Sequence, residues 1–360
     1  MFGKITVLTL ATSVILVQSA PYYRNFYWDL GSAGVDDSTS YSGTGTALYG
    51  STVSASDNQR NAQGQSSFSA TCWSTGGLTC AVYTLTNPNR NSNGFFTEYT
   101  IKDGSWQKPT SVSSSTVSIL MNTPMVAVNT HDFGRKETAV FFISKDNKLS
   151  YFDRVDGAAG FTLSSQNLPI TGSVQYMTAA TWRNTNSNPA YSIWYSDQNG
   201  NVYSWRYDKT GKWNFDDQQI GITVSGSFVV SIQSDHLMTD LYSPIGHHWK
   251  RIGAAGSPWT SQGDFSIQDH GHSFSGISGG ILPWDITQAK FYFSGKQSQG
   301  LVEGSIGVNS TNLNIDHTFN INPTVGTNTV TSMYGSNIIN IFTMTAQGIV
   351  SIVSTDGGNN

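Results

Sequence analysis

The sequence has few charged residues for its length. Lys, Arg, Asp and Glu make up 12% of the 360 residues, and the formal net charge is −4; charged residues make up about a quarter of a typical soluble domain. No cluster of Lys or Arg is present to neutralise a phosphate backbone, so a nucleic-acid partner is not expected. Aromatic residues, at 12%, supply enough apolar surface for a folded core, which argues against disorder.

Long apolar runs are also scarce. One run, at residues 5–17, follows Lys4 and precedes the small residues Ser19 and Ala20. This layout predicts a secretory signal peptide over residues 1–20. No later run approaches the roughly 20 residues that a membrane-spanning helix needs. We therefore expect a secreted, extracellular protein without membrane insertion.

Cysteine is nearly absent: only Cys72 and Cys80 occur, within CWSTGGLTC. A close, even pair in an oxidising compartment predicts a disulfide, and the two glycines between them suit a hairpin turn. Two thiols without further ligands nearby do not make a tetrahedral metal site, so we expect no metal and no cofactor. The one Asn-x-Ser/Thr sequon, at Asn309, predicts a glycosylated surface loop.

Amphipathic helices are missing as well, because Gly and Asn interrupt every stretch after residue 20 that is long enough to form one. Residues 191–213, YSIWYSDQNGNVYSWRYDKTGKW, instead predict three antiparallel strands joined by two tight turns. Related segments follow one another at intervals of about 50 residues. In each copy the first strand ends at a Ser or Thr, at Thr86, Ser144, Ser196, Ser243, Ser294 and Thr345.

A short run rich in Ala, Ser and Gly precedes each copy, and a further β-type run follows it. With these runs included, each unit of about 50 residues holds four strands. Six such units predict an all-β, six-bladed β-propeller over residues 66–360. Residues 21–65 form an N-terminal segment whose NFYWDLG or TALYGSTVS run would complete the last blade and close the ring. Two alternatives remain open at this stage. In the first, residues 21–65 supply a seventh blade. In the second, the fold is a pair of β-sandwiches, which also have regularly spaced strands.

The repeat resembles the fungal fucose-specific lectins of the Aleuria aurantia type. The likeness is carried by an aromatic strand, an Asp/Asn-Gly turn, an alternating strand, an Asp-Gly turn and a Trp, over about residues 66–358. It implies a six-bladed propeller with sugar pockets between adjacent blades. Each pocket would use an arginine from the second strand of a blade, a glutamate from the third strand and nearby aromatic residues. Such groups form directional bonds to sugar hydroxyls and cover the apolar C–H patch of a sugar.

The chain departs from this family pattern at the arginine. The matching positions read Val140, Ser192, Thr239, Lys290 and Ile341. The glutamate is matched by Glu98 and Glu303, and its position reads Tyr151, Ser204 and Ser351 elsewhere. Lys290 and Glu303 are thus the one cation–carboxylate pair that the pattern retains, and lysine lacks the planar fork of arginine. A surface ion pair is the alternative explanation for these two residues.

The aromatic residue after the Asp-Gly turn is better preserved, and it reads Trp106, Phe161, Trp213 and Trp259. Packing of large aromatic rings between blades is the alternative explanation for these residues. From the resemblance we expect a non-enzymatic, lectin-like protein that binds fucose or related glycans and glycoproteins through several weak pockets. The expected ligand-binding residues are Lys290, Glu303, Glu98, Trp106, Trp213 and Trp259. A propeller glycoside hydrolase or lyase, and an extracellular adhesion or coat protein without sugar binding, are the alternative functions.

Overall fold

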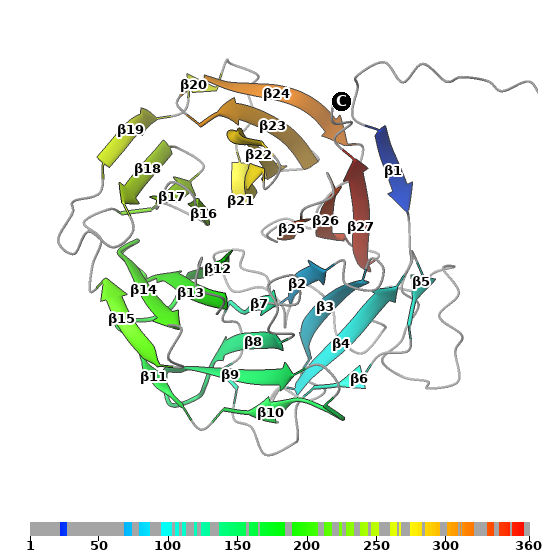
Figure 1. The fold of residues 1–360 in the computed structure, drawn as a ribbon, viewed down its shortest axis with the longest axis vertical. Helices are drawn as coiled ribbons and strands as arrows, with labels where there is room; N and C mark the ends of the chain where they lie inside the picture. The colour runs from blue at the N-terminus through cyan, green and yellow to red at the C-terminus, as the bar shows by residue number, and fades with distance from the viewer. Residues whose placement is uncertain are drawn as a thin grey trace, which may run out of the picture.

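The computed structural model describes residues 22–26 and, with gaps in the connecting segments, residues 68–355. Every regular element in this part of the chain is a β-strand, and these strands form six sheets. Figure 1 shows the sheets arranged around a common centre. The fold is an all-β propeller, as the repeat predicted, because the strands of each sheet follow one another outward from the centre.

The first three sheets are built from consecutive strands. The first contains β2 (Phe68–Trp73), β3 (Thr79–Thr86), β4 (Phe95–Lys102), β5 (Ser105–Trp106) and β6 (Thr110–Ser111). The second contains β7 (Val126–Asn129), β8 (Glu137–Ile143), β9 (Lys148–Val155), β10 (Thr162–Leu163) and β11 (Leu168–Pro169). The third contains β12 (Tyr176–Arg183), β13 (Pro189–Ser196), β14 (Val202–Tyr207) and β15 (Trp213–Asp217).

The fourth and fifth sheets are also built from consecutive strands, and the sixth adds β1 to three consecutive strands. The fourth contains β16 (Val229–Gln233), β17 (Met238–Ser243), β18 (Gly246–Arg251) and β19 (Thr260–Asp264). The fifth contains β21 (Phe274–Leu282), β22 (Asp285–Gly295), β23 (Leu301–Gly307), β24 (Asn312–Phe319) and the short β20 (Ser266–Ile267), which pairs in parallel with β24. The sixth contains β25 (Val330–Tyr334), β26 (Ile338–Thr345), β27 (Gly348–Thr355) and β1 (Tyr22–Phe26).

The innermost strands of neighbouring sheets contact one another around the centre. β2 lies beside β7, β7 beside β12, β12 beside β16, β16 beside β21, β21 beside β25, and β25 beside β2. Gly279, on the innermost strand β21, marks a close approach between two neighbouring strands of one sheet. Its φ is +119°, and a Cβ atom at this position would collide with the carbonyl oxygen of Lys290 on the next strand. Glycine is therefore the residue that lets β21 approach β22 here.

The segment at residues 191–213 forms three antiparallel strands, as predicted, namely most of β13, all of β14 and the start of β15. Its first turn is held by Asp197, whose Oδ1 accepts hydrogen bonds from the backbone N–H of Asn199 (2.8 Å) and of Asn201 (2.9 Å). Gly200 adopts φ +80°, and a Cβ atom there would collide with the carbonyl oxygen of Val224. The Asn-Gly signal therefore marks a position that requires glycine.

β1 comes from the N-terminal segment and pairs antiparallel with β27 at the outer side of the sixth sheet (Figure 1). Arg24 lies opposite Val353 in this pair. The strand overlaps only the first two residues of the NFYWDLG run. The predicted signal peptide, the TALYGSTVS run, Trp259 and Asn309 lie outside the described residues.

The core lies between the faces of neighbouring sheets. Ala81, Tyr83 and Phe96 of the first sheet pack against Phe142 and Phe152 of the second. The opposite face of the second sheet packs against the third, with Phe141 and Tyr195 in one cluster. All seven residues of β8 are buried, which explains why this strand does not alternate between apolar and polar residues.

The predicted disulfide joins Cys72 and Cys80, which lie opposite each other on β2 and β3. Both cysteines are buried, with 3% and 1% of their surface exposed. The bridge therefore ties the innermost strand of the first sheet to the second strand.

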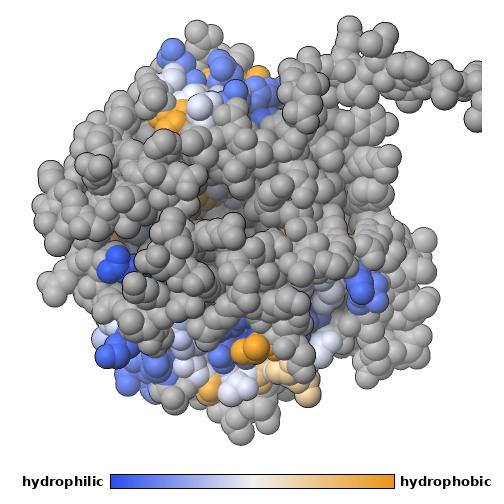
Figure 2. Space-filling model, viewed as in Figure 1, coloured by the Kyte–Doolittle hydropathy of each residue, from blue (hydrophilic) through white to orange (hydrophobic). Residues whose placement is uncertain are grey.

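The described surface has no broad apolar area. Val155 and Leu163 are the large apolar side chains that are exposed in this part of the chain. Figure 2 shows hydrophilic, intermediate and hydrophobic atoms mixed along the lower edge of the molecule. None of the described residues forms a helix long and apolar enough to cross a membrane.

Candidate functional site

The two glutamates of the repeat occupy the same place in their sheets. Glu98 on β4 lies opposite Tyr83 on β3, and Glu303 on β23 lies opposite Tyr292 on β22. Both tyrosines are fully buried. In the second and third sheets the matching pairs are Tyr151 opposite Phe141 and Ser204 opposite Trp194. In these four sheets the third-strand position lies opposite an aromatic residue of the second strand.

The same strand register shows that Val140 does not stand at the arginine position of the second strand. Lys290 and Ser192 lie two residues before their aromatic partners, whereas Val140 lies one residue before Phe141. A shift of one residue moves a side chain to the other face of a sheet, and Val140 indeed packs toward the first sheet. Ala139 is the residue on the face of Phe141, toward the third sheet. The corrected position still holds no arginine in the second, third or fifth sheet.

Lys290 and Glu303 form an ion pair within the fifth sheet. Nζ of Lys290 lies 3.2 Å from Oε1 of Glu303, and their side chains are 8% and 0% exposed. The pair is buried, so the alternative of a solvated surface pair is wrong. Each charge needs the other here, because a single charge left in the interior is strongly destabilising.

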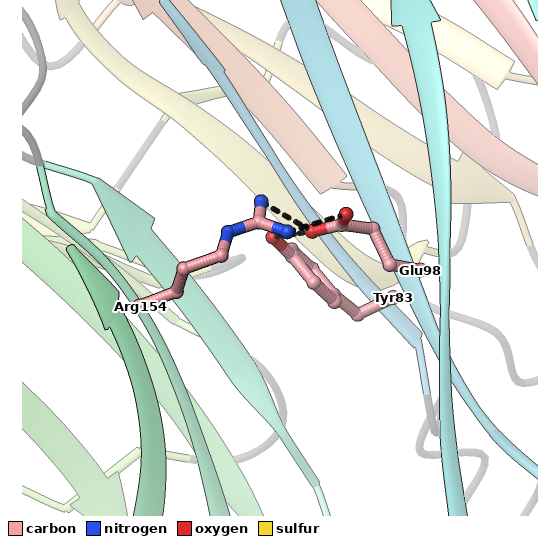
Figure 3. Close-up of polar contacts among 3 residues, drawn as sticks. All are labelled: Tyr83, Glu98 and Arg154. Carbon is pink, nitrogen blue, oxygen red and sulfur yellow. Dashed lines mark hydrogen bonds and ion pairs between the residues drawn. The ribbon is translucent and has the colours of Figure 1, made fainter. Parts of the chain in front are cut away.

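A second cluster surrounds Glu98, between the first and second sheets (Figure 3). Tyr83 donates its hydroxyl hydrogen to Oε2 of Glu98 at 2.6 Å. Arg154 on β9 donates from Nη1 to Oε1 at 2.9 Å and from Nη2 to Oε2 at 2.8 Å. This is the two-pronged geometry that gives an arginine–carboxylate pair its strength. Glu98 is 4% exposed, and the side chain of Arg154 is 25% exposed.

An aromatic ring completes this cluster. The guanidinium carbon of Arg154 lies 4.4 Å from the ring centre of Phe161, which is cation–π distance. Phe161 also contacts Tyr83 edge to face, with 5.9 Å between ring centres. Burial raises the pKa of Tyr83 well above its ordinary value, and the negative charge of Glu98 raises it further. Tyr83 therefore stays protonated and donates to Glu98.

Arg154 was missed by the sequence prediction, which placed the cation on the second strand of the glutamate's own sheet. It comes instead from the third strand of the next sheet. The signal that could have found it is the segment YFDRVDGAAGF, where Arg154 stands between Tyr151, at the glutamate position, and Phe161, the aromatic after the turn.

At the interface between the second and third sheets, the equivalent positions hold aromatic residues. Tyr151 replaces the glutamate, and Trp213 replaces Phe161. Trp213 Nε1 donates to the Tyr151 hydroxyl at 3.4 Å. The Trp213 ring centre lies 5.7 Å from that of Phe141 and 5.1 Å from that of Tyr207, which stands at the Arg154 position. The structure thus brings Trp213 to the predicted site but without a carboxylate.

The remaining predicted residues are placed only in part. Trp106 lies in β5, opposite Ile101 on β4. Within the described ranges, no three His, Cys, Asp or Glu side chains are close enough together to hold a metal ion.

Comparison with known proteins shows the fold. No family model matches the chain, and no curated protein sequence matches it. A crystal structure of the Aleuria aurantia lectin, described as a six-bladed β-propeller with a novel fucose recognition mode, superposes with a TM-score of 0.58 at 19% identity, over 84% of this chain and 95% of that one. The chain has the fold of the Aleuria aurantia lectin.

Two further structures share that Aleuria-type fold. AofleA from Arthrobotrys oligospora matches with a TM-score of 0.55 at 13% identity, over 89% of this chain and 88% of that one. The BP39L lectin from Burkholderia pseudomallei matches with a TM-score of 0.55 at 14% identity, over 84% of this chain and 83% of that one. At these identities the likeness concerns the architecture.

Proposed function

We propose that the protein is a secreted, non-enzymatic carbohydrate-binding protein and that Lys290 and Glu303 form its principal site. The observation that carries the proposal is a buried cation–carboxylate pair at the position where the Aleuria-type repeat offers its polar groups. A mutant of the Aleuria aurantia lectin has been solved with alpha-methyl-L-fucoside and with Fucalpha1-6GlcNAc. Fucosylated glycans and glycoproteins are therefore the first ligands to test.

The chemistry of the pair suits sugar hydroxyls. An ammonium group donates hydrogen bonds to hydroxyl oxygens, and a carboxylate beside it accepts one of its hydrogens and so orients it. Glu303 is fully buried and Lys290 retains a small exposed fraction. A sugar would therefore meet Lys290 first, and Glu303 would act by fixing the direction of the ammonium group.

We further propose a ring of six blades that is closed by β1. The proposal is supported by the contacts of the innermost strands, which run from β2 to β25 and back to β2, and by the pairing of β1 with β27. Several weak sites around such a ring would bind a glycan-coated surface more tightly than one site alone. Secretion is supported by the leader-like residues 1–20 and by the disulfide, since disulfides persist in oxidising compartments.

A glycan array on the purified mature protein tests the function. We expect binding to fucosylated glycans and no turnover of a labelled oligosaccharide. Turnover would favour a propeller hydrolase or lyase. No glycan signal, together with tight binding of a protein ligand, would favour an adhesion or coat protein.

The site is tested by replacing both charges together. Lys290→Met with Glu303→Leu removes the ion pair without leaving a buried charge, so the fold should survive. We expect this double variant to lose at least ~10-fold in affinity, which corresponds to ~1.4 kcal/mol. Asp316→Asn is the matched control, because Asp316 is an exposed acid on the same sheet that accepts from Ser305. An unchanged signal in the double variant would remove the site assignment.

A further inference from the structure

Arg154 belongs to one sheet, and the groups that it contacts belong mainly to another. Arg154 is on β9 of the second sheet, and Glu98 and Tyr83 are on β4 and β3 of the first sheet. Figure 3 shows the guanidinium reaching across to the carboxylate and the phenol. The same two sheets are also joined near the centre, where Ser69 Oγ accepts from the backbone N–H of Ala127 at 2.8 Å. Arg154 therefore adds an outer connection to an inner one.

The polar groups at this interface between the first and second sheets are hydrogen-bonded to other groups of the protein. Both oxygens of Glu98 accept from Arg154, and one of them also accepts from Tyr83. The guanidinium also covers the Phe161 ring. A carboxylate, a hydroxyl and an aromatic face are the groups that would receive a planar cation, and here the cation is a side chain of the protein.

We propose that this contact is a binding site for a planar organic cation and that Arg154 is its built-in ligand. Arg154 locks the second sheet to the first. When Arg154 is truncated, a small guanidinium ion takes its place between Glu98 and Phe161. The proposal does not depend on glycan binding, and it predicts that this contact contributes nothing to it while Arg154 is in place.

The burial of Glu98 and the partial exposure of Arg154 support the replacement of the truncated side chain by a guanidinium ion. Glu98 is 4% exposed, so truncation of Arg154 leaves a carboxylate in the interior without its cation, which destabilises the fold. The side chain of Arg154 is 25% exposed, so its place is open to solvent on one side. A guanidinium ion matches both the fork of the carboxylate and the ring face, whereas tetramethylammonium can lie over a ring but has no N–H to donate to the carboxylate.

Thermal unfolding of Arg154→Ala in the presence of methylguanidinium chloride tests the proposal. Methylguanidinium at low millimolar concentration should raise the Tm of Arg154→Ala, because a ligand that binds only the folded state stabilises it. Tetramethylammonium chloride at the same concentration is the control for charge and ionic strength. The parent protein should show no such rise, since Arg154 fills the site.

Glu98→Gln with Arg154→Ala identifies the acceptor. This double variant should be more stable than Arg154→Ala, and methylguanidinium should not raise its Tm. An equal rise with tetramethylammonium, or an equal rise in the double variant, would overturn the proposal.

A double-mutant cycle covers the case in which Arg154→Ala does not fold. Arg154→Met keeps most of the side-chain volume and is measured beside Glu98→Gln and the combined variant. The proposal requires the combined variant to unfold at a higher temperature than Arg154→Met alone. Additive effects of the two substitutions would show that the residues are not coupled, and the proposal would be wrong.

Discussion

Tyr83 and Glu98 face each other across neighbouring strands, with 2.6 Å between Tyr83 Oη and Glu98 Oε2. The tyrosine is fully buried, and burial is the main cause of its raised pKa. The negative charge of Glu98 raises that pKa further, and the positive charge of Arg154 opposes the rise. The hydrogen bond therefore ties the protonation of Tyr83 to the stability of the first sheet.

The first prediction concerns alkaline pH. The pKa of Tyr83 in the folded protein lies above its unfolded value of about 10. Below pH ~10 the tyrosine is protonated in both states, so its contribution to stability is fully present. As the pH rises from ~10 toward the folded pKa, the unfolded state ionises first and stability falls. Tyr83→Phe should reduce this fall, measured as the urea midpoint between pH 7 and 11.

The control for this experiment is the loss of stability at alkaline pH that remains in Tyr83→Phe. Burial also raises the pKa of Tyr176 and of Tyr195, so part of the fall persists in the variant. Identical pH profiles for the parent and Tyr83→Phe would show that Tyr83 does not couple folding to pH.

The second prediction concerns the close approach of β21 and β22. Gly279 adopts φ +119°, and a Cβ atom there would collide with the carbonyl oxygen of Lys290. Gly279→Ala should destabilise the protein by about 1–3 kcal/mol or more, because both strain and overlap are introduced. The backbone beside Lys290 would shift, so glycan affinity should fall as well. Urea unfolding and a glycan titration measure the two effects.

Gly307→Ala on β23 of the same sheet is the matched control. A Cβ atom there would meet Ser310 Cβ at 3.7 Å, an ordinary van der Waals distance, and Gly307 does not adopt a positive φ. The unfolding midpoint of this variant should stay close to that of the parent. Equal losses in the two alanine variants would contradict the argument from close approach.

The third prediction concerns the disulfide between Cys72 and Cys80, which are eight positions apart in the sequence. Replacing both cysteines with alanine should lower the free energy of unfolding by about 2–3 kcal/mol, since closing a loop of this size restricts the unfolded chain. The parent should resist a reductant in its folded state, because both cysteines are buried. Rapid reduction of the folded parent would contradict this expectation.

The sequence predicted the strands well because their signals are local. The Asn199-Gly200 turn and the alternating runs around it lie within one short segment, and so do Cys72 and Cys80. The positions of Val140 and Arg154 could not be assigned in the same way. The face of Val140 depends on strand register, and a Ser at the end of a strand does not fix that register. The partner of Arg154 is 56 residues away in the sequence, so only the packing of two sheets brings them together.

The last prediction compares the interface between the first and second sheets with the interface between the second and third sheets. It tests whether the two are versions of one site. Tyr151 and Tyr207 stand where Glu98 and Arg154 stand in the preceding contact, and Trp213 stands in the place of Phe161. Tyr151→Glu alone should destabilise the protein by about 3 kcal/mol or more, because it buries a carboxylate without a cation. Adding Tyr207→Arg should restore at least ~1 kcal/mol by forming an arginine–carboxylate pair over the Trp213 ring.

Tyr207→Arg alone is the matched control for this pair of substitutions. By itself it offers the cation no carboxylate at the Tyr151 position, so it should not stabilise the parent. Urea unfolding, followed by tryptophan fluorescence, measures all four proteins, and the coupling energy of the cycle isolates the new pair. A coupling energy near zero would show that the two contacts hold their polar groups at different distances, even though the strand register places them at matching positions.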